Sequence, residues 1–247
     1  MADNPDPMQT DRVTRRASLA RFGGLVAATL GAGGLAGAAD AGGPAAVAQG
    51  LVSCVLTPEL TEGPYYIPGE KVRRNITEGK PGAPLELHLG VLDVSTCHAL
   101  AGATVDIWHC DAGGIYSGFV AASTGGAPGG GGGPTDKRTF LRGIQPTNAQ
   151  GVATFQTIYP GWYRGRAVHI HVKVHLGGNV VHTGQLFFSD TLTDTVYKRS
   201  PYKARPNRDT RNADDSIYKN GGSKSVLAVQ KSGAGYVARV TMGVHRS

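Results

Sequence analysis

The stretch Gly161-Trp-Tyr-Arg-Gly-Arg-Ala-Val-His-Ile-His-Val-Lys-Val174 ends in a strict alternation of apolar and polar residues. From Ala167 onward, apolar residues alternate with His169, His171 and Lys173. A period of two is typical of a β-strand, in which successive side chains leave opposite faces of the sheet. Both imidazoles therefore leave the same face, close enough to share one metal ion.

The His-x-His pair alone does not identify a site, because an exposed strand face can carry two histidines without binding anything. Imidazole also binds zinc, copper, iron and nickel, so the pair does not select the metal. Zinc catalysis usually involves three His or Glu donors, and His175 and His182 are available as further donors. A ferrous site with two histidines and one carboxylate would need a nearby Asp or Glu. These alternatives stay open at this point.

Four further motifs occur in order along the chain. Val105-Asp-Ile-Trp-His-Cys-Asp-Ala-Gly-Gly-Ile-Tyr-Ser117 is an apolar strand that runs into a glycine turn and presents Tyr116. It is followed by Thr139-Phe-Leu-Arg-Gly143, by Tyr159-Pro-Gly-Trp-Tyr163 and, after the histidines, by Thr183-Gly-Gln-Leu-Phe-Phe188. The ordered set is more specific than any one of its members.

Taken together, these motifs resemble those of the intradiol ring-cleavage dioxygenases, non-haem ferric enzymes that open catechols between the two hydroxyls. The resemblance covers roughly residues 54–220 and implies a β-sandwich with an Fe³⁺ site near one end. It implies that a small aromatic diol and O₂ react to give a muconate-type diacid. The positions that match the iron ligands are Tyr116, Tyr163, His169 and His171. Two phenolates and one hydroxide would balance the 3+ charge, and two neutral imidazoles would complete five-coordination.

The resemblance also implies roles for single residues. Tyr163 would be the axial ligand that the substrate displaces and that then acts as a base. Arg166 and Gln185 would be catalytic, because a guanidinium keeps its charge and can stabilise negative charge that develops on the ring. Glu62-Gly-Pro-Tyr-Tyr66 resembles the family's Gly-Pro segment near the pocket, so Tyr65 or Tyr66 would contact the substrate. A turn followed by an aromatic anchor explains these two tyrosines equally well.

Two functions of other classes compete with this interpretation. One is a non-catalytic secreted β-sandwich, a binding module that keeps a relic metal site. The other is a copper or zinc protein that uses His169, His171 and a third histidine. A disused site would first lose the groups that do not hold the fold, so the presence of all the matching residues together favours the dioxygenase. No organic cofactor is expected.

The fold class predicted from the sequence is all-β. The candidate strands are short, rich in β-branched residues and separated by Gly, Pro and Asn, which is typical of a β-sandwich. They are Leu85–Val94, Thr104–His109, Val152–Thr157, Ala167–Val174, Val180–Phe188, Ser225–Val229 and Tyr236–Val244. The glycine-rich run Thr124–Thr135 lacks the Gly-Lys-Ser/Thr sequence of a phosphate-binding loop, and we expect a flexible excursion.

The N-terminal region predicts export. Thr14-Arg-Arg-Ala-Ser-Leu19 is a twin-arginine motif, followed by the weakly apolar stretch Phe22–Ala39 and the cleavage pattern Ala46-Val-Ala48. A retained membrane anchor is the alternative, but a spanning helix needs about 20 strongly apolar residues. We therefore expect 1–48 to be a twin-arginine signal and 49–247 to be one extracellular or cell-envelope domain without a membrane span.

The formal net charge of +7 can indicate a nucleic-acid partner. The basic residues from Lys198 to Lys219 are, however, interspersed with Pro, Asn and Asp rather than arranged as a patch with aromatic residues. We therefore expect a solvated loop and no nucleic-acid partner, and the sequence does not set the oligomeric state.

The three cysteines Cys54, Cys97 and Cys110 imply one bridge and one free thiol in an oxidising compartment. Cys110 lies in the motif that leads to Tyr116, so we expect it to be a small buried side chain near the site. That leaves Cys54–Cys97 as the predicted disulfide, with a Cys97–Cys110 linkage as the alternative.

Overall fold

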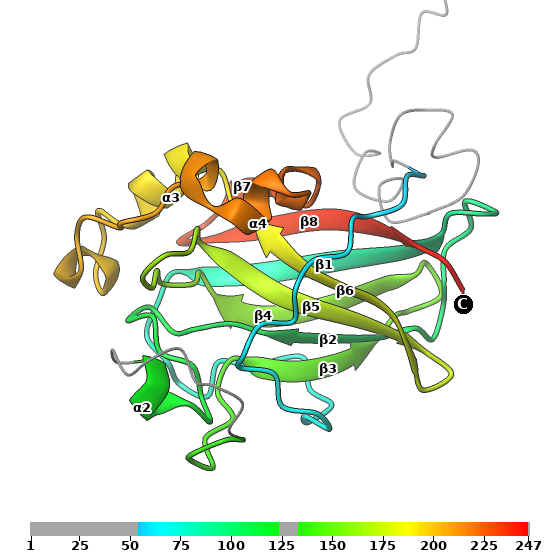
Figure 1. The fold of residues 1–247 in the computed structure, drawn as a ribbon, viewed down its shortest axis with the longest axis horizontal. Coiled ribbons are helices and arrows are strands. Elements are labelled where there is room, and N and C mark those ends of the chain that lie inside the picture. The colour runs from blue at the N-terminus through cyan, green and yellow to red at the C-terminus, as the bar shows by residue number, and fades with distance from the viewer. Residues whose placement is uncertain (1–53, 124–132, 247) are drawn as a thin grey trace, which may run out of the picture. The chain divides into compact units, whose positions relative to one another are not determined.

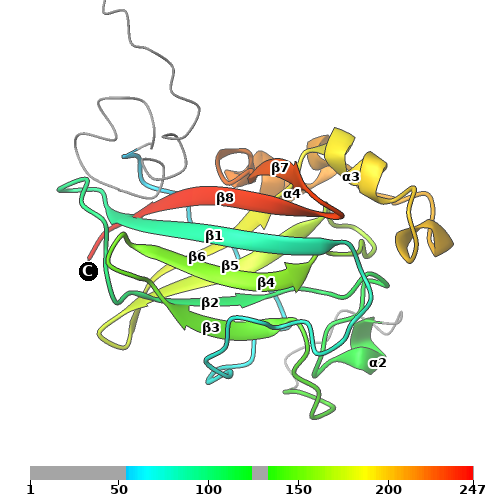
Figure 2. The same cartoon turned by 180° about the vertical axis from the view of Figure 1, so that it is seen from behind.

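The computed structural model describes residues 54–123 and 133–246, which form two four-stranded sheets. In spatial order, the first sheet contains β4 (Val152–Ile158), β1 (Pro84–Asp93), β8 (Gly235–Val244) and β7 (Ala228–Ser232). The second contains β3 (Arg142–Pro146), β2 (Thr104–Trp108), β5 (His169–Leu176) and β6 (Asn179–Phe187). Figures 1 and 2 show the sheets as two layers. The predicted β-sandwich is confirmed.

All seven predicted strands are present, with boundaries that differ by three residues at most. β3 is an additional strand, antiparallel to β2. The connections carry short helices, α2 (Val120–Ser123), α3 (Asp190–Val196) and α4 (Ser216–Lys219), and three 3₁₀ turns, Tyr202–Ala204, Asn212–Asp214 and Gly222–Lys224. In the described part of the chain, none of the helices has the length and apolar character needed to cross a bilayer.

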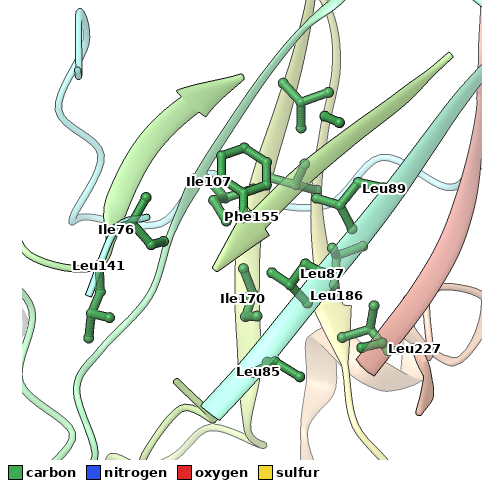
Figure 3. Close-up of a cluster of buried hydrophobic side chains, with 14 of the residues drawn as sticks. Ile76, Leu85, Leu87, Leu89, Ile107, Leu141, Phe155, Ile170, Leu186 and Leu227 are labelled. Carbon is green, nitrogen blue, oxygen red and sulfur yellow. The ribbon is translucent and has the colours of Figure 1, made fainter. Parts of the chain in front are cut away.

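The space between the two sheets is filled by the apolar side chains of alternate strand positions. Leu87 and Leu89 of β1 and Phe155 of β4 meet Ile107 of β2 and Ile170 of β5, and all five are fully buried (Figure 3). Burying a side chain of this size contributes about 1.5–3 kcal/mol, so the alternation along β5 fixes which face turns inward. His169 and His171 therefore leave the opposite face.

The outward face of β5 is nevertheless covered, because the segment that precedes β1 crosses over it. The Leu60 backbone N–H donates to the Thr183 carbonyl of β6 at 2.9 Å. At Gly63 the chain passes so close to the His171 ring that a β-carbon would lie 3.0 Å from its Cε1 atom, and φ is +74°. Both requirements are met by glycine. His169 and His171 are each 1% exposed as a result.

Two predictions fall on residues outside those described. They are the export signal over residues 1–48 and the flexible excursion over residues 124–132 of the glycine-rich run.

The predicted disulfide is present, joining Cys54 to Cys97 in the turn that follows β1, with 5.5 Å between the Cα atoms. Cys110 is free and buried, and its thiol donates to the Gly161 carbonyl. Replacing both Cys54 and Cys97 by Ser should lower the free energy of unfolding by about 3–4 kcal/mol, because the crosslink restricts the unfolded chain. Denaturant unfolding of this variant against wild type measures the loss. Peptide mapping without reductant that finds Cys97 linked to Cys110 would contradict the assignment.

Candidate active site

The four residues proposed as metal ligands lie together at one end of the β3-β2-β5-β6 sheet. The Tyr163 hydroxyl lies 3.0 Å from Nε2 of His169, which in turn lies 3.0 Å from Nε2 of His171. The Tyr116 ring packs edge-on against the rings of Tyr163 and His171, with centroids 5.6 and 6.0 Å apart. β5 supplies the two histidines, and loops supply the two tyrosines, so local strand geometry fixes only half of the cluster.

The protonation state of His169 follows from its partners. Its Nδ1 lies 2.6 Å from the Ala167 carbonyl, which can only accept a hydrogen bond, so Nδ1 carries the proton. The lone pair of Nε2 therefore faces the cluster. Burial lowers the pKa of His169 to about 3 and holds the pKa of His171 well below its usual value, so both imidazoles are neutral. Neutral imidazole is the form that binds metals.

The tyrosine oxygens in the cluster are governed by burial. Burial raises the pKa of both Tyr116 and Tyr163, and the charge of Arg166 offsets this only in part, so neither phenol ionises unless a further cation is close. The Tyr116 hydroxyl is also buried without a hydrogen-bond partner among the described residues. An unsatisfied buried hydroxyl costs about 1–3 kcal/mol. A hard metal cation would satisfy this oxygen and favour the phenolate.

The alternative with a third histidine finds no support. Within residues 54–123 and 133–246, no three His, Cys, Asp or Glu side chains are grouped closely enough to hold a metal ion. His182 lies on β6 opposite the core residue Val174, so its side chain leaves the sheet on the face opposite to that of Gln185. Gln185 lies directly opposite His171, on the face of the cluster.

Arg166 and Gln185 form a hydrogen-bonded pair beside the cluster. Nη2 of Arg166 donates to Oε1 of Gln185 at 2.5 Å, and Nε2 of Gln185 donates to the Thr61 carbonyl at 2.8 Å. Nε of Arg166 donates to Oδ2 of Asp215 at 2.9 Å. Burial alone would raise the pKa of Asp215. The positive charge of Arg166 and the hydrogen bonds that Asp215 accepts have the larger combined effect, so the pKa of Asp215 lies below its usual value. Asp215 is therefore ionised and pairs with Arg166.

Tyr65 and Tyr66 have different surroundings. The Tyr65 ring stacks on Tyr116, with centroids 4.5 Å apart, and so lies against the cluster. Tyr66 packs on Trp108, at 4.8 Å, and beneath the ammonium group of Lys173. Of the two tyrosines, Tyr65 is therefore the better placed to contact a molecule bound at the cluster.

Comparison with solved structures decides the family. An intradiol ring-cleavage dioxygenase from Tetranychus urticae aligns with a TM-score of 0.74 and 36% sequence identity, over 78% of this chain and 96% of that one. This chain belongs to the intradiol ring-cleavage dioxygenases.

Two further dioxygenases are similar to this chain. The dioxygenase domain of a dioxygenase–carbohydrate-binding fusion from Streptomyces sp. SirexAA-E aligns with a TM-score of 0.57 and 29% identity, over 78% of this chain and all of that one. Catechol 1,2-dioxygenase 1 of Acinetobacter lwoffii is 30% identical over 114 residues. The match spans 32% of that protein's length. A scan against models of protein families finds no match.

Two residues of the candidate site were not predicted from the sequence. Trp108 stacks on His171, with rings 7° from parallel and centroids 4.9 Å apart. Asp215 holds Arg166, although 49 positions separate them in the chain. Asp215 precedes Ser216-Ile-Tyr-Lys219 and caps α4, and an Asp before a short helix is a recognisable signal.

The prediction of a solvated loop from Lys198 to Lys219 is wrong for several residues. Arg205 stacks on Trp162, with its guanidinium carbon 4.4 Å from the ring centroid, and donates to the Trp162 carbonyl. The Arg208 side chain is 5% exposed and pairs with Asp190 at 2.6 Å. Arg205 and Arg208 are held by residues that are distant in sequence, Trp162 and Asp190. The composition of the segment does not reveal these contacts.

Proposed function

We propose that this dioxygenase holds Fe³⁺ through Tyr116, Tyr163, His169 and His171. With this ion it would insert both atoms of O₂ into a catechol-type diol and open the ring between the hydroxyl-bearing carbons. The observation that carries the proposal is the convergence of the Tyr163 oxygen and two imidazole nitrogens beside the Tyr116 ring, whose oxygen is buried without a hydrogen-bond partner among the described residues. Phenolate oxygen suits a hard trivalent cation, and the donor set therefore fits ferric iron.

When bound, Fe³⁺ would draw electron density from a chelated diol and make its ring reactive toward O₂. The positions of the surrounding residues indicate a separate role for each of them. Tyr116 is 1% exposed, whereas Tyr163 is partly exposed, and we assign Tyr163 as the ligand whose phenol oxygen would give way to the diol and accept its proton. Tyr65 supplies an aromatic face beside the cluster. Arg166 and Gln185 provide fixed donors for negative charge that develops on the ring.

We further propose that the enzyme is exported through the twin-arginine route to the cell envelope or the extracellular space. The sequence of residues 1–48 supports this, since the route carries folded proteins and would follow iron loading. The Cys54–Cys97 disulfide also supports it, because such bonds persist in oxidising compartments.

The purified protein should be wine-red and contain about one iron per chain, because tyrosinate bound to Fe³⁺ absorbs visible light. With catechol, protocatechuate or hydroxyquinol it should consume O₂ and form a muconate-type diacid. Reaction under ¹⁸O₂, followed by mass spectrometry, should place two labelled atoms in the product. A colourless protein without iron that cleaves none of these diols would overturn the proposal, and an active zinc- or copper-loaded protein would favour the rival metal site.

A further inference from the structure

The orientation of Arg166 is fixed from two sides. Its Nε atom donates to Asp215, before α4, at 2.9 Å, and its Nη2 atom donates to Gln185, on β6, at 2.5 Å. A guanidinium is planar, so anchoring these two nitrogens sets the direction of the whole group. Within the described residues, Nη1 makes no hydrogen bond, so its two N–H groups, together with the second N–H of Nη2, are left for a bound molecule.

The Asp215 carboxylate is saturated by donors. Oδ1 accepts the backbone N–H groups of Ile217 at 2.7 Å and Tyr218 at 3.0 Å, as the N-cap of α4. Oδ2 accepts the backbone N–H of Ala167 at 2.8 Å and Nε–H of Arg166 at 2.9 Å. All four partners donate, and the side chain has no exposed surface. An ionised carboxylate fits this arrangement, since an amide group would turn N–H toward other N–H groups.

The second oxygen of Asp215 does more than a helix cap requires. One oxygen is enough to cap α4, which has four residues. The other oxygen binds Arg166 and Ala167, which lead directly into His169 at the start of β5. Because a misplacement of about 1 Å can cost roughly 10²-fold in rate, the anchor of a charge-stabilising arginine affects turnover.

We propose that Asp215 is a positioning residue for Arg166, whose guanidinium it aims at the substrate bound beside Tyr163 and His169. The proposal rests on the proposed function and adds a residue that touches neither the substrate nor the metal ligands. Loss of the Asp215 charge should therefore act on turnover through Arg166, the only side chain among the described residues that donates a hydrogen bond to Asp215.

Asp215→Asn should lower kcat by about 10- to 100-fold, with KM within about twofold and iron content unchanged. Asp215→Ser should have the same effect. Ser is also a good N-cap residue, so this variant should preserve α4 even where Asp215→Asn disturbs that helix. Asp190→Asn is the matched control, since Asp190 pairs with Arg208 at 2.6 Å and does not contact Arg166. This control should keep the wild-type kcat.

A double-mutant cycle separates positioning from a general structural role. In an Arg166→Ala background, Asp215→Asn should add less than about twofold to the loss of kcat, because its effect passes through the missing guanidinium. A full additional loss in that background would overturn the proposal, and so would wild-type kcat in both Asp215 variants.

Nuclear magnetic resonance of the full chain loaded with diamagnetic Ga³⁺ gives a readout independent of turnover. The Nε–H signal of Arg166, assigned from its absence in Arg166→Ala, should exchange slowly with solvent in wild type and in Asp190→Asn. It should lose this protection in Asp215→Asn and Asp215→Ser. A signal that stays protected in both Asp215 variants overturns the proposal. Iron-loaded wild type that cleaves no diol would instead refute the proposed function. The exchange measurement would still test whether Asp215 holds the Arg166 side chain in place.

Discussion

His169→Ala should leave the protein folded but largely without iron, and ring cleavage should be lost with the metal. Nε2 of His169 lies 3.0 Å from both the Tyr163 hydroxyl and Nε2 of His171, so its removal takes out the middle donor of the cluster. Losing a residue that only supports a metal ligand typically costs about 10–100-fold in metal affinity, and losing the ligand itself should cost more. The fold should survive because His169 faces away from the apolar core formed by residues such as Ile170.

Elemental analysis, the visible spectrum and thermal unfolding of the same sample measure this outcome. His175→Ala is the matched control, because His175 lies on the same strand and does not contact the cluster. The control should keep its iron, colour and activity. A His169→Ala protein that binds iron as tightly as the control would show that His169 is not a ligand.

Arg166→Ala should reduce turnover by roughly 10²–10³, equal to about 3–4 kcal/mol, while iron and colour remain. The loss is expected in kcat, because a fixed guanidinium acts on charge that develops during reaction rather than on the resting metal site. Iron should remain because the hydrogen bonds of the Arg166 side chain go to Asp215 and Gln185, not to the tyrosines or histidines.

Arg164→Ala is the control for Arg166, since Arg164 is exposed on the same turn and should contribute little. Steady-state cleavage by both variants, with iron measured in the same samples, checks the prediction. Equal activity of the two variants at equal iron occupancy would remove Arg166 from the mechanism.

The part of the site that lies on β5 could be predicted from local sequence. The two-residue period from Ala167 to Val174 fixes a strand, an inward face and an outward face that carries both histidines. The resemblance to intradiol dioxygenases then added Tyr116 and Tyr163, which are close in space to the histidines although loops carry them. Periodicity alone could not have selected these two among nine tyrosines.

Features that depend on long-range contacts were not predictable in this way. β3 reads Arg-Gly-Ile-Gln-Pro, with a single large apolar residue, Ile144, so no alternation marks it as a strand. Its position comes from pairing with β2 and from Arg73, whose side chain donates to the Arg142 carbonyl at 3.0 Å. The pairing of Asp215 with Arg166 was not predictable either, because the two residues are 49 positions apart and meet only when the chain folds back beside β5.

The parallel pairing of β1 with β8 has a consequence for folding order. These two strands are the inner pair of the β4-β1-β8-β7 sheet, yet one is the first strand of the described chain and the other is the last. The sheet that carries the histidines is complete in sequence at Phe187. During synthesis β1 can pair with β4, but its other edge stays open until Val244 has emerged. An unpaired edge favours association with other chains, so aggregation during production should depend most on how soon β8 forms and covers the edge of β1.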